Sequence, residues 1–371
     1  HFQPWWGVPK IGMLHDFLGV QIPINTFCIR QYASPTVHAL RVRQCQRRAE
    51  LPRAATVQTA WPLVSEEYFE YIDVLSSVVD YVELERGRSA QRRYAFVELG
   101  CGYGHWTWTA HQALQQLLPG APYKYLLTDV QPTLEPFLQG IGRNHSVEPH
   151  SLRFHPGKVA NVSRTGPLRG KYYFINWHHE EWLKEHLQHI RPGPIAAEPL
   201  PITLHELLAI HQMPCVLDMV DVDIDGGEIA FFDDPNALDL LTARARRIHL
   251  GVHVNVTTIM GRLGVRGWRL ERHYGNGRKA DTEWGPVSFG DGVASLLNAN
   301  FSFDKAETFC SQGPSILPKP KKGAAHRRKP SPPPGAPGRP PTRAHHHTPP
   351  LPPKAQRSWL HKLLSWLSHS D

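Results

Sequence analysis

The segment Tyr94–Gly104, with the sequence YAFVELGCGYG, is the part of this chain that most constrains its fold. An apolar run ends in an acid, Glu98, and three glycines follow at alternate positions, Gly100, Gly102 and Gly104. Residues 105–118 then have the periodicity of a helix. The segment therefore predicts a strand, a tight turn and a helix, because glycine permits unusual backbone dihedrals and lets a ligand approach the bare backbone.

The spacing of the glycines excludes two common nucleotide-binding motifs. A phosphate loop would end in Gly-Lys-Ser/Thr, and a dinucleotide fingerprint would read G-x-G-x-x-G. The segment instead resembles the E-x-G-x-G-x-G first motif of S-adenosylmethionine-dependent methyltransferases. This resemblance implies a cofactor site formed by Glu98, Gly100, Cys101, Gly102, Tyr103 and Gly104. An ordinary glycine-rich strand-helix turn is the alternative interpretation of the motif.

A second predicted strand supports the first interpretation. Residues 123–129 are mostly apolar and end in Asp129, about 25 residues after the glycine turn. An acid at this place in nucleotide-binding α/β folds bonds to the hydroxyls of a ribose. Asp129 is therefore the ribose-binding candidate. A solitary acid at the end of a strand is more often a helix cap, so this interpretation depends on its pairing with the glycines.

The net charge of the chain is +8 at pH 7, but its distribution does not indicate a nucleic-acid-binding domain. Residues 319–362 contain eleven Lys or Arg and no acid. The rest of the chain therefore contains thirty basic and thirty-three acidic residues, a net charge of about −3. A nucleic-acid methyltransferase would need a basic surface for phosphate contacts. We therefore expect no nucleic-acid partner for the folded domain, and the methyltransferase resemblance implies a small-molecule or glycan acceptor instead.

The cysteines and the apolar runs bear on the compartment. Five cysteines are scattered without C-x-x-C spacing, which favours reduced thiols over a disulfide framework and gives no zinc motif. No run of about 18 apolar residues is present. A cytoplasmic location is favoured on these grounds. Four tripeptides fit the glycosylation pattern, at Asn144, Asn161, Asn255 and Asn300, but such short patterns also arise by chance.

Strands alternate with helices along the middle of the chain, which predicts an α/β domain with a mostly parallel sheet flanked by helices and joined by right-handed crossovers. We expect an irregular leader over residues 1–60, a methyltransferase domain over 61–310 with an insertion at about 166–200, a disordered Pro-rich basic linker over 311–355 and a short amphipathic helix over 356–371. Within the domain, helices are expected at 64–82, 132–141, 202–209, 236–245 and 256–263, and further strands at 152–155, 216–225 and 247–253, with a terminal hairpin from 268 to about 303.

Two stretches, one rich in histidine and one acidic, are candidates for a metal-binding site. Residues 178–190 hold four histidines and three glutamates at helical spacing, but the H-E-x-x-H pattern fails at its second histidine. Asp221, Asp223 and Asp225 match the start of a calcium-binding loop, yet Phe232 stands where that loop needs a bidentate glutamate. We therefore predict no metal site. A buried strand that ends in several carboxylates instead indicates a functional strand end.

Three segments together resemble the FkbM-type methyltransferases. Residues 202–208 (ITLHELL), 217–228 (LDMVDVDIDGGE) and 248–253 (IHLGVH) correspond to the T-L-D-x-L-L, D-L-L-K-I-D-V-E-G-A-E and H-I-E-x-H segments of that family. The likeness covers about residues 64–270. It implies a class I, Rossmann-like methyltransferase domain that uses S-adenosylmethionine and acts on hydroxyls of sugars or secondary metabolites. The chain departs from the family at Asp221, where lysine is usual, and at Gly251, where the family has glutamate.

Methyl transfer to a hydroxyl needs a group that accepts the proton of that hydroxyl. Asp223 and His253 are the candidates for this catalytic role, since both lie at predicted strand ends and an unperturbed histidine titrates near neutrality, at a pKa of about 6.5. Each residue also has a purely structural interpretation: Asp223 as a helix cap, and His253 as a histidine whose ring nitrogens are hydrogen-bonded at the end of a strand. Two other functions stay open. One is a Mg²⁺-dependent O-methyltransferase in which Asp223 and Asp225 hold the ion. The other is a catalytically degenerate binding module that works through its basic tail; the 356–371 segment is a candidate for contact with a membrane surface or a protein.

Overall fold

The computed structural model of the chain describes residues 1–10, 12–23, 56–130, 132, 134–157, 159, 201–224 and 226–312. The predicted insertion at 166–200, the linker, the tail helix and Asp225 lie outside these residues. Within them, no helix is long and apolar enough to cross a bilayer.

A seven-stranded sheet forms the centre of the molecule, with the order β10-β13-β9-β8-β5-β6-β7. Neighbouring strands among β9, β8, β5, β6 and β7 are parallel, whereas β13 runs antiparallel to both of its neighbours. An antiparallel last strand inserted between the fifth and sixth strands is the class I methyltransferase arrangement of the Rossmann-like fold. The predicted fold class is therefore confirmed. The strands span Tyr94–Leu99 (β5), Tyr123–Asp129 (β6), Leu152–Pro156 (β7), Leu217–Val222 (β8), Ala245–Val252 (β9), Trp268–Tyr274 (β10) and Gly292–Asn298 (β13).

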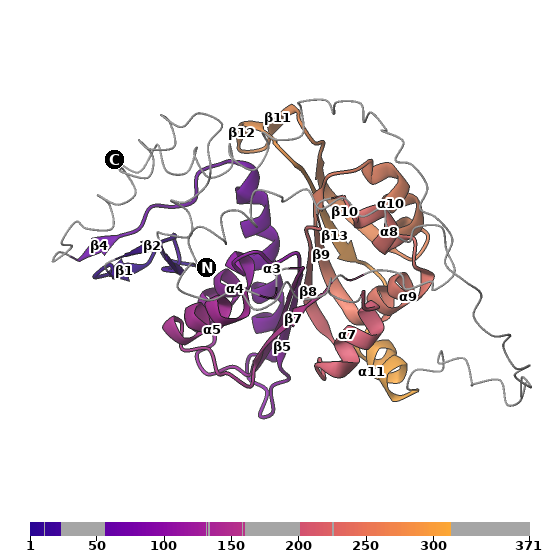
Figure 1. The fold of residues 1–371 in the computed structure, drawn as a ribbon, viewed down its shortest axis with the longest axis horizontal. Coiled ribbons are helices and arrows are strands. Elements are labelled where there is room, and N and C mark those ends of the chain that lie inside the picture. Colours follow the sequence, from indigo (N-terminus) through magenta and orange to yellow (C-terminus); the bar gives the residue numbers. More distant parts are fainter. Residues whose placement is uncertain are drawn as a thin grey trace, which may run out of the picture.

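Helices cover both faces of this sheet (Figure 1). One face packs against three helices, α3 (Glu66–Glu85), α4 (His105–Leu117) and α5 (Leu134–Asn144). The other face packs against α7 (Leu204–Ile210), α8 (Glu228–Phe232), α9 (Pro235–Arg244), α10 (Val256–Gly264) and α11 (Phe303–Ser311).

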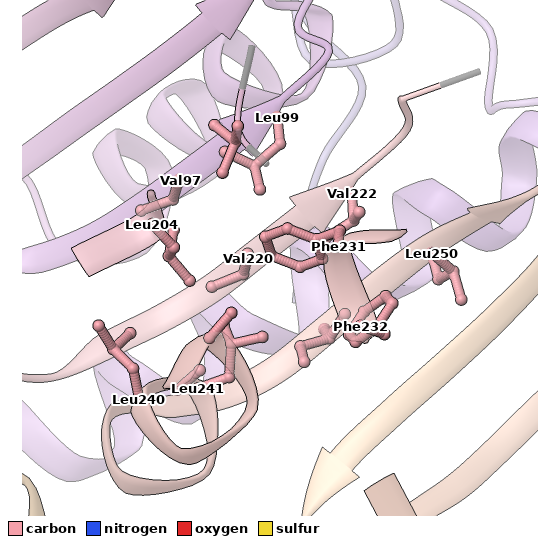
Figure 2. Packing of buried hydrophobic residues seen from close by; sticks show 14 of the residues in the cluster. Val97, Leu99, Leu204, Val220, Val222, Phe231, Phe232, Leu240, Leu241 and Leu250 are labelled. Atoms are coloured by element: carbon pink, nitrogen blue, oxygen red, sulfur yellow. The ribbon is translucent and has the colours of Figure 1, made fainter. Parts of the chain in front are cut away.

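The two cores follow from the period of two along each strand. In β5, Ala95, Val97 and Leu99 point to the α7–α11 side, and Tyr94 and Phe96 point to the α3–α5 side. Parallel strands that are buried on both faces read as continuous apolar runs, which explains the composition of β5. Figure 2 shows the first core, in which residues of β5 and β8 pack against the phenylalanines of α8 and the leucines of α9.

Small elements that the sequence did not reveal lie outside the main sheet. Two short antiparallel pairs, β1 (Trp6–Gly7) with β4 (Val57–Gln58) and β2 (Met13–His15) with β3 (Gln21–Pro23), occupy the expected leader. A hairpin of β11 (Lys279–Thr282) and β12 (Gly285–Ser288) interrupts the terminal hairpin. The terminal hairpin itself ends at Asn298, and the residues after it form α11.

The prediction that the thiols are reduced is wrong for two of the five cysteines. Cys215 and Cys310 form a disulfide that joins α11 to the loop before β8, with Cα atoms 5.9 Å apart. The two residues are separated by 95 positions, so their spacing carries no local signal. Cys101 is a free, buried thiol.

Candidate functional site

The glycine turn joins β5 to α4 and has the unusual dihedrals that the sequence predicts. Gly100, Gly102 and Gly104 have φ of +83°, +49° and +69°, in the left-handed region that favours glycine. At Gly100 the contact is also close, since an added Cβ would come within 1.8 Å of the carbonyl oxygen of Asp223. The glycine turn therefore lies directly against the end of β8.

Asp129 and Gly102 meet as the sequence predicts. The Gly102 amide donates a hydrogen bond of 3.1 Å to Oδ2 of Asp129, which ends the neighbouring strand β6. A Cβ built on Gly102 would meet no atom of the described chain within 4 Å. The turn therefore presents open backbone beside an acid at the carboxyl edge of the sheet, where open α/β sheets bind their ligands.

Glu98 lies in a different environment from Asp129. Its Oε2 accepts hydrogen bonds from the amide and the hydroxyl of Thr107, in the first turn of α4, at 3.0 and 2.5 Å. The side chain is buried, and burial raises its pKa to about 8, although the bonds from Thr107 oppose the rise. Glu98 therefore holds the start of α4 against β5, and its influence on a ligand would pass through the glycine turn.

The two other predicted cofactor residues complete the turn. Cys101 is buried, which raises the pKa of its thiol well above the usual range, and its amide bonds to the carbonyl of Thr128 at 2.9 Å. The carbonyl of Tyr103 accepts a 2.7 Å bond from the indole of Trp108, and its ring contacts Phe137 edge-on. Both residues therefore fix the path of the turn.

The predicted catalytic residues, Asp223 and His253, are brought together. Nε2 of His253 lies 3.6 Å from Oδ1 of Asp223 and 3.7 Å from Oδ1 of Asp291, and its Nδ1 lies 2.9 Å from Oε1 of Glu228. Asp223 is the most exposed of the three acids, with a quarter of its side chain accessible. The cluster lies at the carboxyl ends of β8 and β9, next to the glycine turn.

The charges around His253 change its predicted role. Burial alone would lower its pKa, but the hydrogen bonds with Asp291 and Glu228 and the charge of Asp223 outweigh burial and raise the pKa from 6.5 to about 11. His253 is therefore an imidazolium at neutral pH and cannot accept a further proton. Of the two candidates for a proton acceptor, Asp223 remains.

A row of buried ionisable groups, which sequence analysis missed, crosses the sheet beneath α3. Glu98, Asp221 and His249 occupy the same register on β5, β8 and β9. His249 bonds through Nδ1 to Asp73 of α3 at 2.7 Å, and Glu70 lies 3.3 Å from its Nε2. Glu70 and Asp73 lie on the buried face of α3 in the structure, but helical periodicity places them on the polar side of the predicted helix, so the sequence carried no signal for this network.

Asp221 is the residue of this row that departs from the FkbM pattern. It is 2% exposed, and its Oδ1 has no hydrogen-bond partner among the described residues. Burial raises its pKa well above the usual range, while the charge of His249 acts in the opposite direction. Asp221 therefore belongs to the buried network rather than to the open side of the sheet edge.

A second missed cluster ties the leader to the start of α4. Oδ2 of Asp16 accepts a 3.0 Å bond from the hydroxyl of Tyr71 and lies 3.4 Å from Nε2 of His105, the residue after Gly104. Oδ1 of Asp16 accepts the amides of Leu18 and Val20. The leader therefore packs directly beside the glycine turn.

No group of three or more metal-ligating side chains is present among the residues that the structure describes. The histidine-rich stretch at 178–190 and Asp225 lie outside them, so the metal alternatives that involve those residues stay predictions.

Comparisons with known proteins give similarity at the level of the fold. No family model matches the chain, and no curated protein matches it. Solved structures with similar folds include a precorrin-6y C5,15-methyltransferase from Geobacter metallireducens GS-15 (12% identity, 64% of this chain and 93% of that chain, TM-score 0.30). A second is a magnesium protoporphyrin IX methyltransferase from Synechocystis PCC 6803 with bound SAM (12% identity, 64% of this chain and 86% of that chain, TM-score 0.27). A third is a human methyltransferase 10 domain containing protein (11% identity, 64% of this chain and 85% of that chain, TM-score 0.32). These identities and scores are too low to indicate a function, which depends on the chain's own residues.

Proposed function

We propose that this chain is an S-adenosylmethionine-dependent methyltransferase that methylates a hydroxyl of a sugar or small metabolite. The observation that carries the proposal is the bond between Gly102 and Asp129 beside open backbone, at the carboxyl edge of a sheet with class I topology. The open face at Gly102 fits a ligand that approaches the main chain closely, and Asp129 fits one with a ribose. The FkbM-like segments support a hydroxyl as the acceptor.

The residues of the turn would hold the cofactor in complementary ways. Gly100, Gly102 and Gly104 give the backbone its path, Cys101 and Tyr103 fix that path, and Asp129 offers its carboxylate. Glu98 acts one step away, by anchoring the first turn of α4 through Thr107. S-adenosylmethionine, when bound, supplies an electrophilic methyl group, so the protein contributes mainly the proximity and orientation of the two reactants.

Asp223 would take the proton of the acceptor hydroxyl. Its carboxylate is partly exposed and lies beside the glycine turn, because its own carbonyl contacts Gly100. His253, protonated and held by Glu228 and Asp291, keeps a positive charge 3.6 Å from Asp223 and orients that carboxylate. Asp223 would accept the proton that the acceptor hydroxyl loses on methylation.

Titration calorimetry of the full chain with S-adenosylmethionine tests the proposal first. We expect binding that Asp129→Ala weakens and that Asp239→Asn, an exposed acid on α9, leaves unchanged. Failure of the unaltered chain to bind would contradict the proposal and favour the degenerate binding module.

Transfer of a labelled methyl group to a panel of sugars and small hydroxylated metabolites tests the reaction itself. We expect Asp223→Asn to abolish transfer while cofactor binding persists. Activity that is lost to a chelator and restored by Mg²⁺ would instead support the metal-dependent alternative.

A further inference from the structure

The Cys215–Cys310 disulfide indicates where this chain folds. Two thiols become a disulfide only by losing two electrons to an oxidant, and such bonds persist chiefly in secretory and extracellular compartments. The bond joins two distant parts of the fold, the loop before β8 and helix α11. It therefore argues against the cytoplasmic location that the sequence favours, and it makes the glycosylation tripeptides relevant.

One of these tripeptides, Asn300-Phe301-Ser302, lies in the turn between β13 and α11. Asn300 is exposed, and its interactions in the described structure use its backbone: its amide bonds to Oδ1 of Asn298 and its carbonyl accepts Nζ of Lys305, each at 3.2 Å. Its side chain packs over Gly267, where an added Cβ would come within 2.0 Å of Nδ2, so a glycan on this nitrogen requires the exposed side chain to rotate away from Gly267. Among the described residues, no side-chain hydrogen bond of Asn300 would be lost on modification.

The other tripeptides are less suited to modification. Asn144 is only half-exposed at the end of α5, and the next residue, His145, is buried. Asn255 caps α10 through a 2.9 Å bond from the amide of Thr257 and lies two residues after His253. Asn161 lies outside the described residues.

The position of Asn300 also keeps a glycan away from the candidate site. Asn298, the last residue of β13, pairs with the first residue of β10, Trp268, and its side chain bonds to the carbonyl of Ala245, the first residue of β9. The carboxyl end of β13 therefore lies at the edge of the sheet where the parallel strands begin. The cluster of Asp223 and His253 lies at the opposite, carboxyl edge.

We propose that Asn300 carries an N-linked glycan. In the reaction, Nδ2 of Asn300 forms a bond to C1 of an oligosaccharide carried on a polyprenyl diphosphate. The bond between C1 and the diphosphate oxygen breaks, the lipid diphosphate leaves with the electron pair, and the amide nitrogen loses one proton to the transferase. This inference does not depend on the methyltransferase proposal.

The test uses the full chain, directed to the secretory lumen of eukaryotic cells by an added signal sequence. We expect its gel mobility to increase on treatment with an amidase that removes N-glycans, and peptide mapping to find aspartate at position 300 after that treatment. Asn300→Gln should remove the shift, because it removes the acceptor asparagine, while the variant keeps the backbone bonds at this position. Asn255→Gln should retain it.

A second pair of variants separates loss of the glycan from loss of the fold. Ser302→Thr keeps both the tripeptide and a hydroxyl that can cap α11, as Ser302 does, and should stay glycosylated. Ser302→Ala should lose the glycan. The proposal is overturned if the secreted chain forms the Cys215–Cys310 bond without a mobility shift, or if Asn300→Gln shifts as the unaltered chain does.

Discussion

Gly251 and Asp223 fit against each other at the edge of the sheet. A Cβ on Gly251 would come within 2.8 Å of Oδ1 and 2.9 Å of Cγ of Asp223. The carboxylate of Asp223 thus lies over a position on β9 that has no side chain. A side chain at position 251 would therefore displace Asp223 from the place it has here.

Substitution of Gly251 should impair methyl transfer more than cofactor binding. Gly251→Ala adds the Cβ that meets the Asp223 carboxylate, and displacement of a catalytic group by about 1 Å costs on the order of 100-fold in rate. We expect kcat to fall by about 10- to 100-fold, while S-adenosylmethionine affinity by calorimetry is unchanged. Gly264→Ala, at an exposed helical glycine where a Cβ meets nothing within 4 Å, is the matched control. Equal rates for the two variants would contradict the role of Gly251.

The imidazolium of His253 should make stability depend on pH. Its pKa is raised to about 11 in the folded chain from 6.5, so the folded state holds a proton that the unfolded state releases. The contribution is fully present below pH 6.5 and is lost as the pH rises towards 11. Urea unfolding of the unaltered chain and of His253→Gln should therefore show a difference in unfolding free energy that shrinks over this range. A difference that stays constant from pH 6 to 10 would show that His253 is neutral when folded.

The fold and the cofactor turn were predictable because their signals are local. The continuous apolar run of β5, which is buried on both faces, and the three glycines of the turn are each visible in a short stretch of sequence. The role of Glu98 was not predictable, because an acid at a strand end can point to either face, and its bond to Thr107 depends on how α4 packs. The same holds for the pKa of His253, which depends on Asp291, a residue 38 positions away in the chain that only the antiparallel β13 brings close.

Removal of the disulfide should lower the stability of the chain. The Cys215–Cys310 bond closes a loop of 95 residues, and loss of a bond of this kind costs about 2–5 kcal/mol in unfolding free energy. We expect this loss for the double variant Cys215→Ser/Cys310→Ser in urea unfolding. A reductant should bring the unaltered chain to the same midpoint and leave the double variant where it is. Equal midpoints for the oxidised chain and the double variant would mean that the bond does not constrain the unfolded state.

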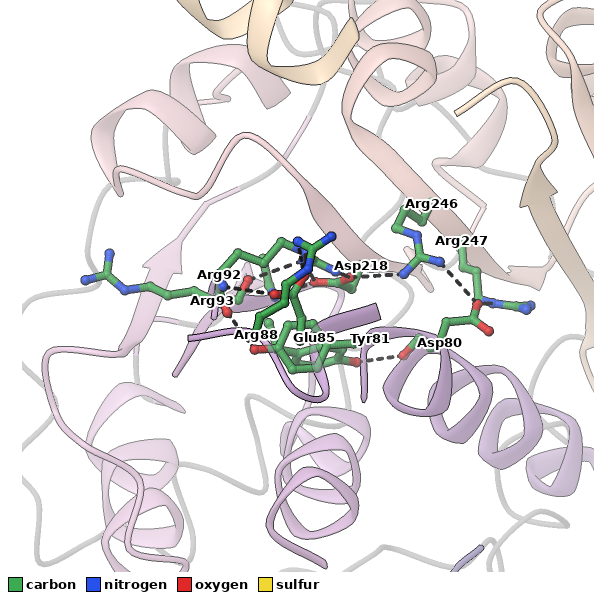
Figure 3. A network of polar contacts seen from close by, with 12 residues as sticks. Asp80, Tyr81, Glu85, Arg88, Arg92, Arg93, Asp218, Arg246 and Arg247 are labelled. Atoms are coloured by element: carbon green, nitrogen blue, oxygen red, sulfur yellow. Dashed lines mark hydrogen bonds and ion pairs between the residues drawn. The ribbon is translucent and has the colours of Figure 1, made fainter. Parts of the chain in front are cut away.

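Asp218 at the start of β8 should be far more sensitive to substitution than an acid on the surface. Its carboxylate accepts two bonds from Arg92, at 2.6 and 2.7 Å, and one from the amide of Ala95, and Arg246 lies 3.5 Å away (Figure 3). The side chain is fully buried, so Asp218→Ala would remove the acceptor of two Arg92 bonds and of a buried backbone amide and would leave Arg92 with Glu85 as its remaining acid, at a cost of about 3–5 kcal/mol.

The surface pair of Asp239 and Arg266 gives the comparison for Asp218. Asp239 is 63% exposed and contacts Arg266 at 3.0 Å, so Asp239→Ala should change the unfolding free energy by only about 0–1 kcal/mol. Asp218→Asn keeps an acceptor for Arg92 but loses the charge, so its loss of unfolding free energy should lie between the losses of Asp218→Ala and Asp239→Ala. Chemical unfolding of the three variants measures the order. A loss for Asp218→Ala no larger than that for Asp239→Ala would show that Glu85, already 2.9 Å from Nε of Arg92, is a sufficient partner for that arginine.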